Sequence, residues 1–117
     1  MAYVDGFVIP VRKDQLDAYK ALAKTASEVW MELGALSYVE CVADDAPYGE
    51  LTSFPRSVQL TEDEVVIFSW IVYRDKASRD EIQAKVMVDE RLMKHPSGMP
   101  FDGKRMIYGG FQPFIQV

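Results

Sequence analysis

The sequence contains one cysteine, one histidine and no long apolar run, and these shortages exclude several classes of protein. Cys41 has no second cysteine with which to form an internal disulfide, so the chain fits a reducing compartment. No apolar stretch approaches the roughly 20 residues that a bilayer crossing needs. The first residues also lack the basic segment and apolar run of a signal peptide. We therefore expect a cytoplasmic protein.

The chain also lacks an excess of basic residues. Its 13 lysines and arginines are outnumbered by 18 aspartates and glutamates, which gives a formal net charge of -5. Nucleic-acid-binding proteins need a concentrated basic face, and anionic membrane surfaces attract basic segments. We therefore expect neither a nucleic acid nor a membrane as a partner.

The overall composition is that of an ordinary globular protein. Hydrophobic residues make up 49% and charged residues 26% of the 117 residues. A chain of this length fits one domain and buries roughly two thirds of its unfolded surface, which is enough for a core without metal or disulfide support. We expect a single domain over residues 1–117.

Hydrophobic spacing predicts four strands and two helices in the order βαββαβ. Gly34 is expected to end the first helix, and Ser78 with Glu81 forms the capping-box pattern that starts the second. The expected strands are residues 3–11, 36–42, 65–73 and 104–114, and the helices run from Lys13 or Asp14 to Leu33 and from Ser78 to about Glu90. Two right-handed crossovers in this order give a ferredoxin-like α+β fold, a four-stranded antiparallel sheet with both helices on one face.

Both faces of the expected sheet are apolar, although helices cover only one of them. In the third strand, one face carries Val66, Phe68, Trp70 and Val72, and the other carries Val65, Ile67, Ile71 and Tyr73. A bare apolar sheet face is a large exposed patch of a kind that monomers avoid. A second copy of the same face, related by two-fold symmetry, is the simplest cover, so we expect a homodimer. The alternative is that the long connection 44–63 folds over this face within one chain.

A family resemblance is carried by three segments: Tyr3–Phe7, Asp63–Trp70 and, above all, Met99–Phe111, which reads MPFDGKRMIYGGF. These segments resemble the YbaA-like proteins, a bacterial family classed as a domain of unknown function. The resemblance covers nearly the whole chain and implies a dimeric α/β barrel, in which two such sheets face each other. The family brings no established activity. Relatives that share the fold include cofactor-independent monooxygenases, isomerases, haem-degrading enzymes and non-catalytic proteins, which is a weak guide to function.

Two carboxylates lie within expected strands. Asp5 lies among apolar residues of a face that should be buried, where a raised pKa would suit it as a catalytic general base. The alternative is that Asp5 caps or pairs at a fraying strand end. Glu40 lies in the middle of the second strand, which is an edge in this topology, so we interpret it as a charge that blocks sheet-to-sheet aggregation. The alternative for Glu40 is a covered face, which is unusual for a glutamate.

The expected ligand-binding residues are Arg56, Phe54, Trp70 and Tyr108. Arg56 and Phe54 lie in the long connection, which we interpret as a lid, and an arginine there suits recognition of an anion. The alternatives for Arg56 are a solvated surface charge and a dimer contact. Trp70 is expected to wall a pocket. Tyr108 precedes the pair Gly109–Gly110, where a ligand or a partner chain can approach the backbone.

Three further residues have plainer expected roles. His95 should lie exposed in a loop, and the alternative is a lone axial haem ligand. Cys41 is expected to pack in its strand as a small apolar residue. Arg105 opens the last strand and is not expected to pair with Asp5, because the first and last strands run antiparallel.

Two functions from different classes stay open. The first is an enzyme that acts on a small hydrophobic or aromatic metabolite without a cofactor, monooxygenase- or isomerase-like by fold analogy. Its pocket would lie between the sheet and the helices, with Asp5 or Arg56 supplying the polar chemistry. The second is a non-catalytic dimer that binds a ligand or a protein. No nucleophile–base pair, metal cluster or cofactor motif appears, so we expect no cofactor.

Overall fold

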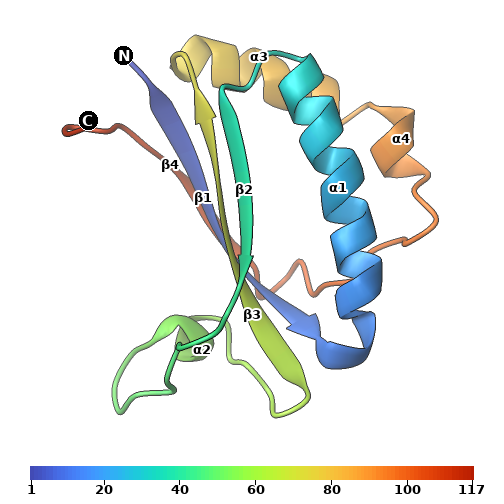
Figure 1. Cartoon of the computed structure of the whole chain (residues 1–117), viewed down its shortest axis with the longest axis vertical. Helices are drawn as coiled ribbons and strands as arrows, with labels where there is room; N and C mark the ends of the chain where they lie inside the picture. The colour runs from blue at the N-terminus through green and yellow to red at the C-terminus, as the bar shows by residue number, and fades with distance from the viewer.

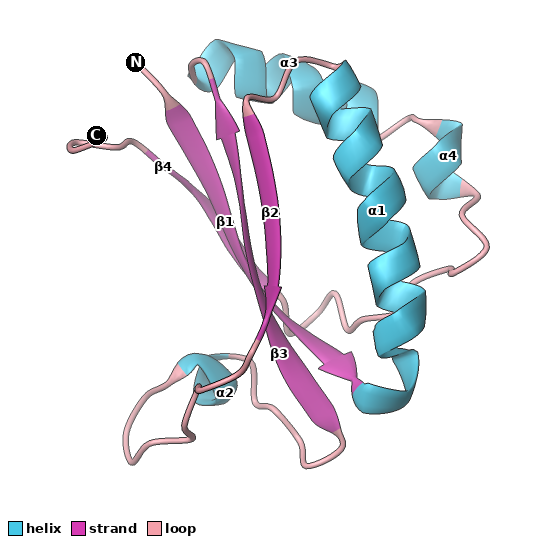
Figure 2. Cartoon of the chain, in the orientation of Figure 1, coloured by secondary structure: helices cyan, strands magenta, loops and turns pink.

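The structure, a computed structural model that describes residues 1–117, has a four-stranded antiparallel sheet with its main helices on one face (Figures 1 and 2). The strands are β1 (Tyr3–Arg12), β2 (Ser37–Val42), β3 (Glu64–Tyr73) and β4 (Ile107–Phe111). Their spatial order is β2-β3-β1-β4, so β3 and β1 are central and β2 and β4 are the edges. The predicted ferredoxin-like α+β fold is confirmed.

Two longer helices and two single-turn helices connect the strands. Helix α1 (Leu16–Glu32) follows a short 3-10 turn, η1 (Lys13–Gln15), and α3 (Lys76–Val86) follows β3. The single turns are α2 (Phe54–Ser57) and α4 (Glu90–Met93). Figure 1 shows α1, α3 and α4 on one side of the sheet and α2 on the other. None of these helices combines the length and the apolar character that a bilayer crossing requires.

Several element ends differ from the predicted ones, because side chains cap the backbone there. The predicted cap at Ser78 is wrong: the Asp75 carboxylate accepts the Ser78 N–H at 2.7 Å, so Asp75 is the cap and α3 begins directly after it. The last strand begins at Ile107 instead of residue 104. Asp102 holds the preceding residues in a turn by accepting the N–H of Lys104 at 2.9 Å.

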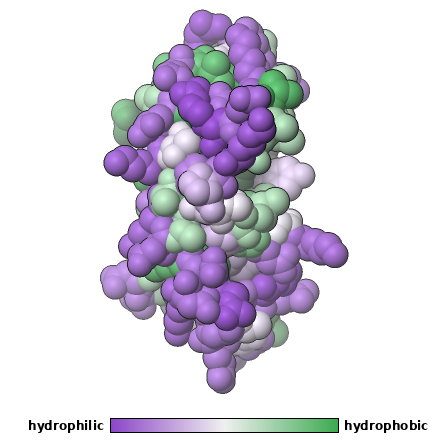
Figure 3. Space-filling model, turned by 90° about the vertical axis from the view of Figure 1, so that its right-hand side faces the viewer, coloured by the Kyte–Doolittle hydropathy of each residue, from purple (hydrophilic) through white to green (hydrophobic).

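The main core lies between the sheet and the helical layer. It consists of two clusters of buried side chains: Tyr3, Val29, Ala35, Ile71, Tyr73, Ile82 and Val86, and Ile9, Val11, Tyr19 and Ile67. The side of the molecule seen in Figure 3, on which α1 and α4 lie, is largely hydrophilic. The helical layer therefore buries its apolar stripe against the sheet and turns a polar surface to solvent.

The opposite face of the sheet, called the open face below, is only partly covered. Val58, which directly follows α2, packs against Val8 and Val66, and all three are buried. Elsewhere the face meets solvent: Phe68 in its centre is 41% exposed and Phe111 on β4 is 64% exposed. The connection 44–63 thus folds over one end of the open face and leaves the centre and the β4 edge bare.

Candidate functional site

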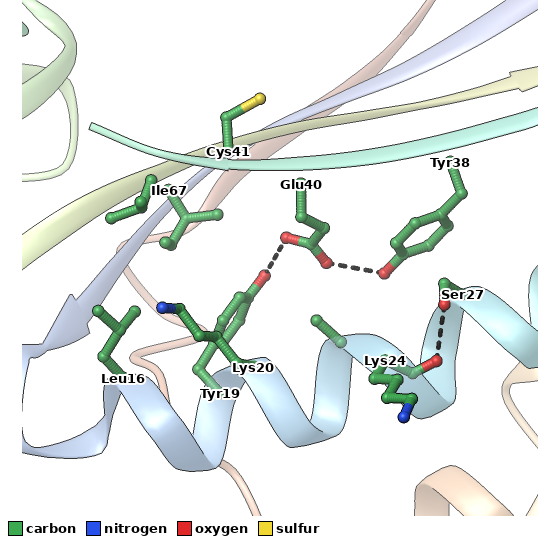
Figure 4. A pocket seen from close by; sticks show the side chains of 11 residues that line it. Leu16, Tyr19, Lys20, Lys24, Ser27, Tyr38, Glu40, Cys41 and Ile67 are labelled. Carbon is green, nitrogen blue, oxygen red and sulfur yellow. Dashed lines mark hydrogen bonds between the residues drawn. The ribbon is translucent and has the colours of Figure 1, made fainter. Parts of the chain in front are cut away.

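A groove with a volume of about 330 Å³ lies between α1 and the edge strand β2 (Figure 4). One wall is formed by side chains that recur every three or four residues along α1, and the other by residues that alternate along β2. The lining residues are Leu16, Tyr19, Lys20, Ala23, Lys24, Ser27, Tyr38, Glu40, Cys41, Val42 and Ile67. Most of them are hydrophobic, and the volume is at the small end of the range for ligand pockets.

Glu40 is the acidic group of this groove, and two tyrosines hold it. Its Oε1 accepts a hydrogen bond from the Tyr19 hydroxyl at 2.6 Å, and its Oε2 accepts one from the Tyr38 hydroxyl at 2.7 Å. Tyr38 and Glu40 project from β2 toward α1, and Tyr19 reaches them from the helix (Figure 4). The interpretation of Glu40 as an edge charge against aggregation is therefore wrong, because its side chain faces the helical layer and each of its carboxylate oxygens accepts a hydrogen bond there.

Both phenols of this cluster remain protonated at neutral pH. Burial, together with the neighbouring Glu40 carboxylate, raises the pKa of Tyr19 and of Tyr38 well above the ordinary value of 10.0. Each tyrosine therefore keeps its proton and donates it to Glu40. Two such charge-assisted hydrogen bonds stabilise a carboxylate in surroundings that are mostly apolar.

Asp5 forms a second buried polar group, outside the groove. Asp5 is only 4% exposed, and its Oδ1 accepts a hydrogen bond from Nη1 of Arg79 on α3 at 2.8 Å. Burial raises the pKa of Asp5, although the Tyr73 hydroxyl and Arg79 act to lower it. The Tyr73 hydroxyl in turn accepts a hydrogen bond from the Trp30 indole at 3.0 Å. The expected burial and raised pKa of Asp5 are thus found, whereas its catalytic role stays a prediction.

Phe54 and Trp70 both lie on the open face, and each packs against Phe68, which lies between them. The ring centroids of Phe54 and Phe68 are 5.5 Å apart, and those of Phe68 and Trp70 are 5.6 Å apart. Arg56 belongs to the same short helix as Phe54, but its Nε donates to the carbonyl of Tyr48 at 2.9 Å and its guanidinium lies 4.0 Å from the centroid of the Tyr48 ring. Arg56 therefore links two parts of the long connection 44–63 and is not among the residues that line the groove.

Tyr108 lies apart from the other expected ligand-binding residues. It is exposed on the edge strand β4, opposite Phe7 of β1, whereas the groove adjoins the other edge. A close approach is found at Gly110, where an added Cβ would lie 2.6 Å from Cε2 of Tyr3. The approaching group is thus a side chain of the same chain, and the expected approach of a ligand or a partner chain stays a prediction.

Arg105 and His95 contact side chains of other elements, whereas Cys41 faces away from the helical layer. Arg105 binds Glu64 through two hydrogen bonds, at 2.9 and 2.5 Å, and is not paired with Asp5, as expected. His95 is half-buried instead of exposed, and its Nε2 lies 3.1 Å from the Thr25 hydroxyl of α1. The Cys41 side chain points away from α1 (Figure 4). No three His, Cys, Asp or Glu side chains are grouped so as to hold a metal ion.

Sequence reasoning missed Tyr19, Tyr38 and Arg79. Tyr38 had a usable signal, because residues two apart in a strand share a face and its neighbour there is a glutamate. Tyr19 lies on the apolar stripe of the first helix, where hydrophobic spacing alone gives no sign of a polar partner. Arg79 had no local signal, since its partner Asp5 is 74 positions away in the sequence.

Fold and groove together define a ferredoxin-like α+β protein with a ligand-sized groove at one edge of its sheet. Residues 2–103 match the model of a family described as "Protein of unknown function (DUF1428)". The chain is also 50% identical over 115 residues to the uncharacterized protein YbaA of Escherichia coli K12, with 98% of both chains covered. The chain therefore belongs to this YbaA-like family, and the resemblance found in the sequence is confirmed.

Solved structures with the same fold are much more distant in sequence. SnoaB, described as a cofactor-independent oxygenase from Streptomyces nogalater, is 11% identical with a TM-score of 0.60, covering 99% of this chain and 96% of its own. A dimeric ferredoxin-like protein from an uncultured marine organism is 12% identical with a TM-score of 0.60, and both chains are covered completely. Similarity at this level establishes the fold alone.

Proposed function

We propose that this protein is a homodimer that binds a small hydrophobic or aromatic metabolite in the groove between α1 and β2. The observation that carries the proposal is the carboxylate of Glu40, held by two phenols in a groove whose other lining residues are mostly apolar. Small-molecule sites typically combine apolar walls with a few convergent polar groups. Asp5, Arg56, Phe54, Trp70 and Tyr108 lie outside this groove.

The homodimer part of the proposal is supported by the open face. Phe68, Trp70 and Phe54 form a continuous aromatic row there, and Phe54 is 52% exposed. Soluble proteins rarely leave such a patch in water. One of the structures with the same fold is described as dimeric, which agrees with this proposal. The single cysteine, free in the structure, supports a cytoplasmic location for the dimer.

Catalysis without a cofactor is a second candidate function, and Glu40 is the observation that favours it. A carboxylate beside an apolar groove can accept a proton from a bound ligand and return it later in the reaction. SnoaB, which has the same fold, is described as a cofactor-independent oxygenase. Incubation of an identified ligand with the protein, followed by mass analysis of the ligand, separates this candidate from binding alone.

Native mass spectrometry of protein purified gently from its source organism tests the proposed function. We expect the mass of two chains, and a small additional mass that is lost under denaturing conditions. The same protein with Ala23→Phe, which enlarges a small lining residue on α1, should carry no additional mass while remaining dimeric. A wild-type protein that never carries or takes up a small molecule at the groove would contradict the binding proposal, and a monomer would contradict the dimer.

A further inference from the structure

The hydrogen-bonding capacity of the groove restricts the chemistry of its ligand. Both carboxylate oxygens of Glu40 accept hydrogen bonds from tyrosine hydroxyls, so Glu40 acts as an acceptor in this groove. Tyr19 and Tyr38 each have one hydroxyl proton, and both protons are already donated to Glu40. The Ser27 hydroxyl is also committed, because it donates to the carbonyl of Lys24 at 2.6 Å. These four side chains therefore present free acceptor lone pairs to the groove and no free donor.

A ligand group that reaches this cluster must therefore supply a proton. A hydroxyl or amino group can donate to the unused lone pairs of the Glu40 carboxylate or of the two phenols. An ether or carbonyl oxygen would instead face other acceptors, which leaves a desolvated polar atom without a partner. The apolar walls, with Leu16, Ala23 and Ile67, suit a hydrophobic or aromatic body for the same ligand.

A lysine of α1 gives the groove a second preference, for an anionic group on the ligand. Lys20 and Lys24 both line the groove, and neither forms an ion pair within the chain. Figure 4 shows the Lys20 side chain beside Tyr19 in the space between α1 and β2, whereas the Lys24 side chain points away from β2. The Lys20 ammonium is thus an unpaired cation of the groove in a protein whose net charge is -5.

We infer that the groove selects a small aromatic acid that bears a hydroxyl or amino group. The hydroxyl or amino group donates to the Glu40–tyrosine cluster, and the carboxylate of the ligand lies at the Lys20 ammonium. This inference rests on the proposed function, because it assigns a ligand class to the same groove. It also explains why a groove with mostly apolar walls contains one carboxylate and, of its two unpaired lysines, one that lies between α1 and β2.

The test uses the full-length protein and matched ligand probes. The probes are meta- and para-hydroxybenzoate and the corresponding aminobenzoates. Their controls are the methoxybenzoates, which accept but cannot donate, and the methyl esters of the hydroxybenzoates, which carry no charge. Heteronuclear NMR spectra of the backbone amides locate binding at α1 and β2 and give the dissociation constants. We expect the best hydroxybenzoate or aminobenzoate to bind about tenfold more tightly than the matching methoxybenzoate or methyl ester.

Two substitutions assign these preferences to residues. Glu40→Gln places an amide donor in the cluster, so the preference for hydroxyl over methoxy should fall to about equal affinity. Lys20→Gln should remove the preference for acid over ester, whereas Lys24→Gln, one turn further along α1, should leave that preference unchanged. If Glu40→Gln fails to fold, the preference for a donor group on the ligand is decided by comparing hydroxy and methoxy probes on the wild-type protein.

The outcomes separate this inference from the proposed function. If hydroxy and methoxy acids, or acids and esters, bind the groove with equal affinity, the ligand class is wrong while binding in the groove stands. If no hydroxybenzoate or aminobenzoate shifts the amide resonances of α1 and β2 at millimolar concentration, the ligand class is also wrong. The native mass spectrum of the purified protein then judges the proposed function independently.

Discussion

Glu64 and Arg105 form the ion pair that holds the segment before β4 against the sheet. Arg105 donates to both carboxylate oxygens of Glu64 and also to Asp102, and Glu64 is almost fully buried. The Arg105 guanidinium, with help from Thr61, lowers the pKa of Glu64 from its ordinary value of 4.5 to about 2. A carboxylate with a lowered pKa stabilises the fold fully above its unfolded-state pKa and loses that contribution as the pH falls toward its folded-state pKa.

We therefore expect Glu64→Gln to lower the free energy of unfolding by on the order of 3 kcal/mol at pH 7, and by roughly half of that near pH 3. Urea unfolding at both pH values measures the effect. Glu62→Gln is the matched control, because Glu62 is exposed two residues away and forms no ion pair. A pH-independent loss at Glu64 would show that the charge is not what stabilises this site.

Asp5 and Arg79 form a buried pair of the opposite kind, in which burial of the carboxylate outweighs its partners. The pKa of Asp5 is raised, so burial makes its charged form less favourable in the folded protein than in the unfolded chain. Removing Arg79 alone leaves that charge without its counter-ion. We expect Arg79→Leu to destabilise the protein by about 3 kcal/mol, and by less than half as much when Asp5→Asn is also present.

A double-mutant cycle in chemical denaturation measures this coupling. Arg74→Leu is a suitable control, because Arg74 is exposed and its ion pair with Asp75 is at the surface. Equal costs of Arg79→Leu in both backgrounds would mean that Arg79 acts through packing on Tyr3, whose ring centroid lies 4.9 Å from the guanidinium.

The join between β4 and β1 depends on one glycine. The ring of Tyr3 crosses Gly110, and a Cβ at that position would lie 2.6 Å from Tyr3 Cε2. The backbone of Gly110 needs no special conformation, so space is the only reason for glycine there. We expect Gly110→Ala to lower the free energy of unfolding by about 1–3 kcal/mol, because either the ring or the edge strand must move.

The neighbouring glycine provides the comparison. An added Cβ at Gly109 would have its nearest contact at 3.5 Å, so Gly109→Ala should change the stability by about 0.5 kcal/mol or less. In a Tyr3→Ala background the further cost of Gly110→Ala should nearly vanish. Thermal unfolding of the single and double variants gives these values, and a Gly110→Ala protein as stable as the wild type would refute the clash.

Elements defined by interactions between residues close in the sequence were predicted well, and features that depend on side-chain hydrogen bonds or on distant residues were not. β3 was predicted within one residue and α1 within three, because their hydrophobic periodicity is local. The starts of α3 and β4 were misplaced, because Asp75 and Asp102 set them through side-chain hydrogen bonds. A pocket was expected between the sheet and the helices, and a groove lies there, but none of the predicted site residues lines it. One of the two hydroxyls that donate to Glu40 belongs to Tyr19 of α1, 21 positions away in the sequence. Strand periodicity cannot show such a contact.

The two layers of the whole molecule present contrasting surfaces. The helical layer turns a largely hydrophilic face outward (Figure 3), whereas the open face presents an aromatic row across its centre. The connection 44–63 buries Val8 and Val66 at one end and cannot cover the rest. The groove lies between α1 and β2, so face-to-face pairing of two sheets leaves α1 outside the interface. Dimer formation and ligand binding can therefore be tested separately.

Phe68 lies on a central strand of the open face, between Val8 of β1 and Cys41 of β2 in the sheet register. A two-fold interface on this face places Phe68 near its middle, where charge is least tolerated. We expect Phe68→Asp to raise the dimer dissociation constant by roughly a hundredfold or more, since each dimer carries the change twice. Val88→Asp is the matched control, because Val88 is 71% exposed on the helical side, between α3 and α4. Sedimentation equilibrium measures both constants, and circular dichroism checks that both variants fold. A folded Phe68→Asp protein that dimerises as tightly as Val88→Asp would place the interface elsewhere, and the open face would then need a different partner.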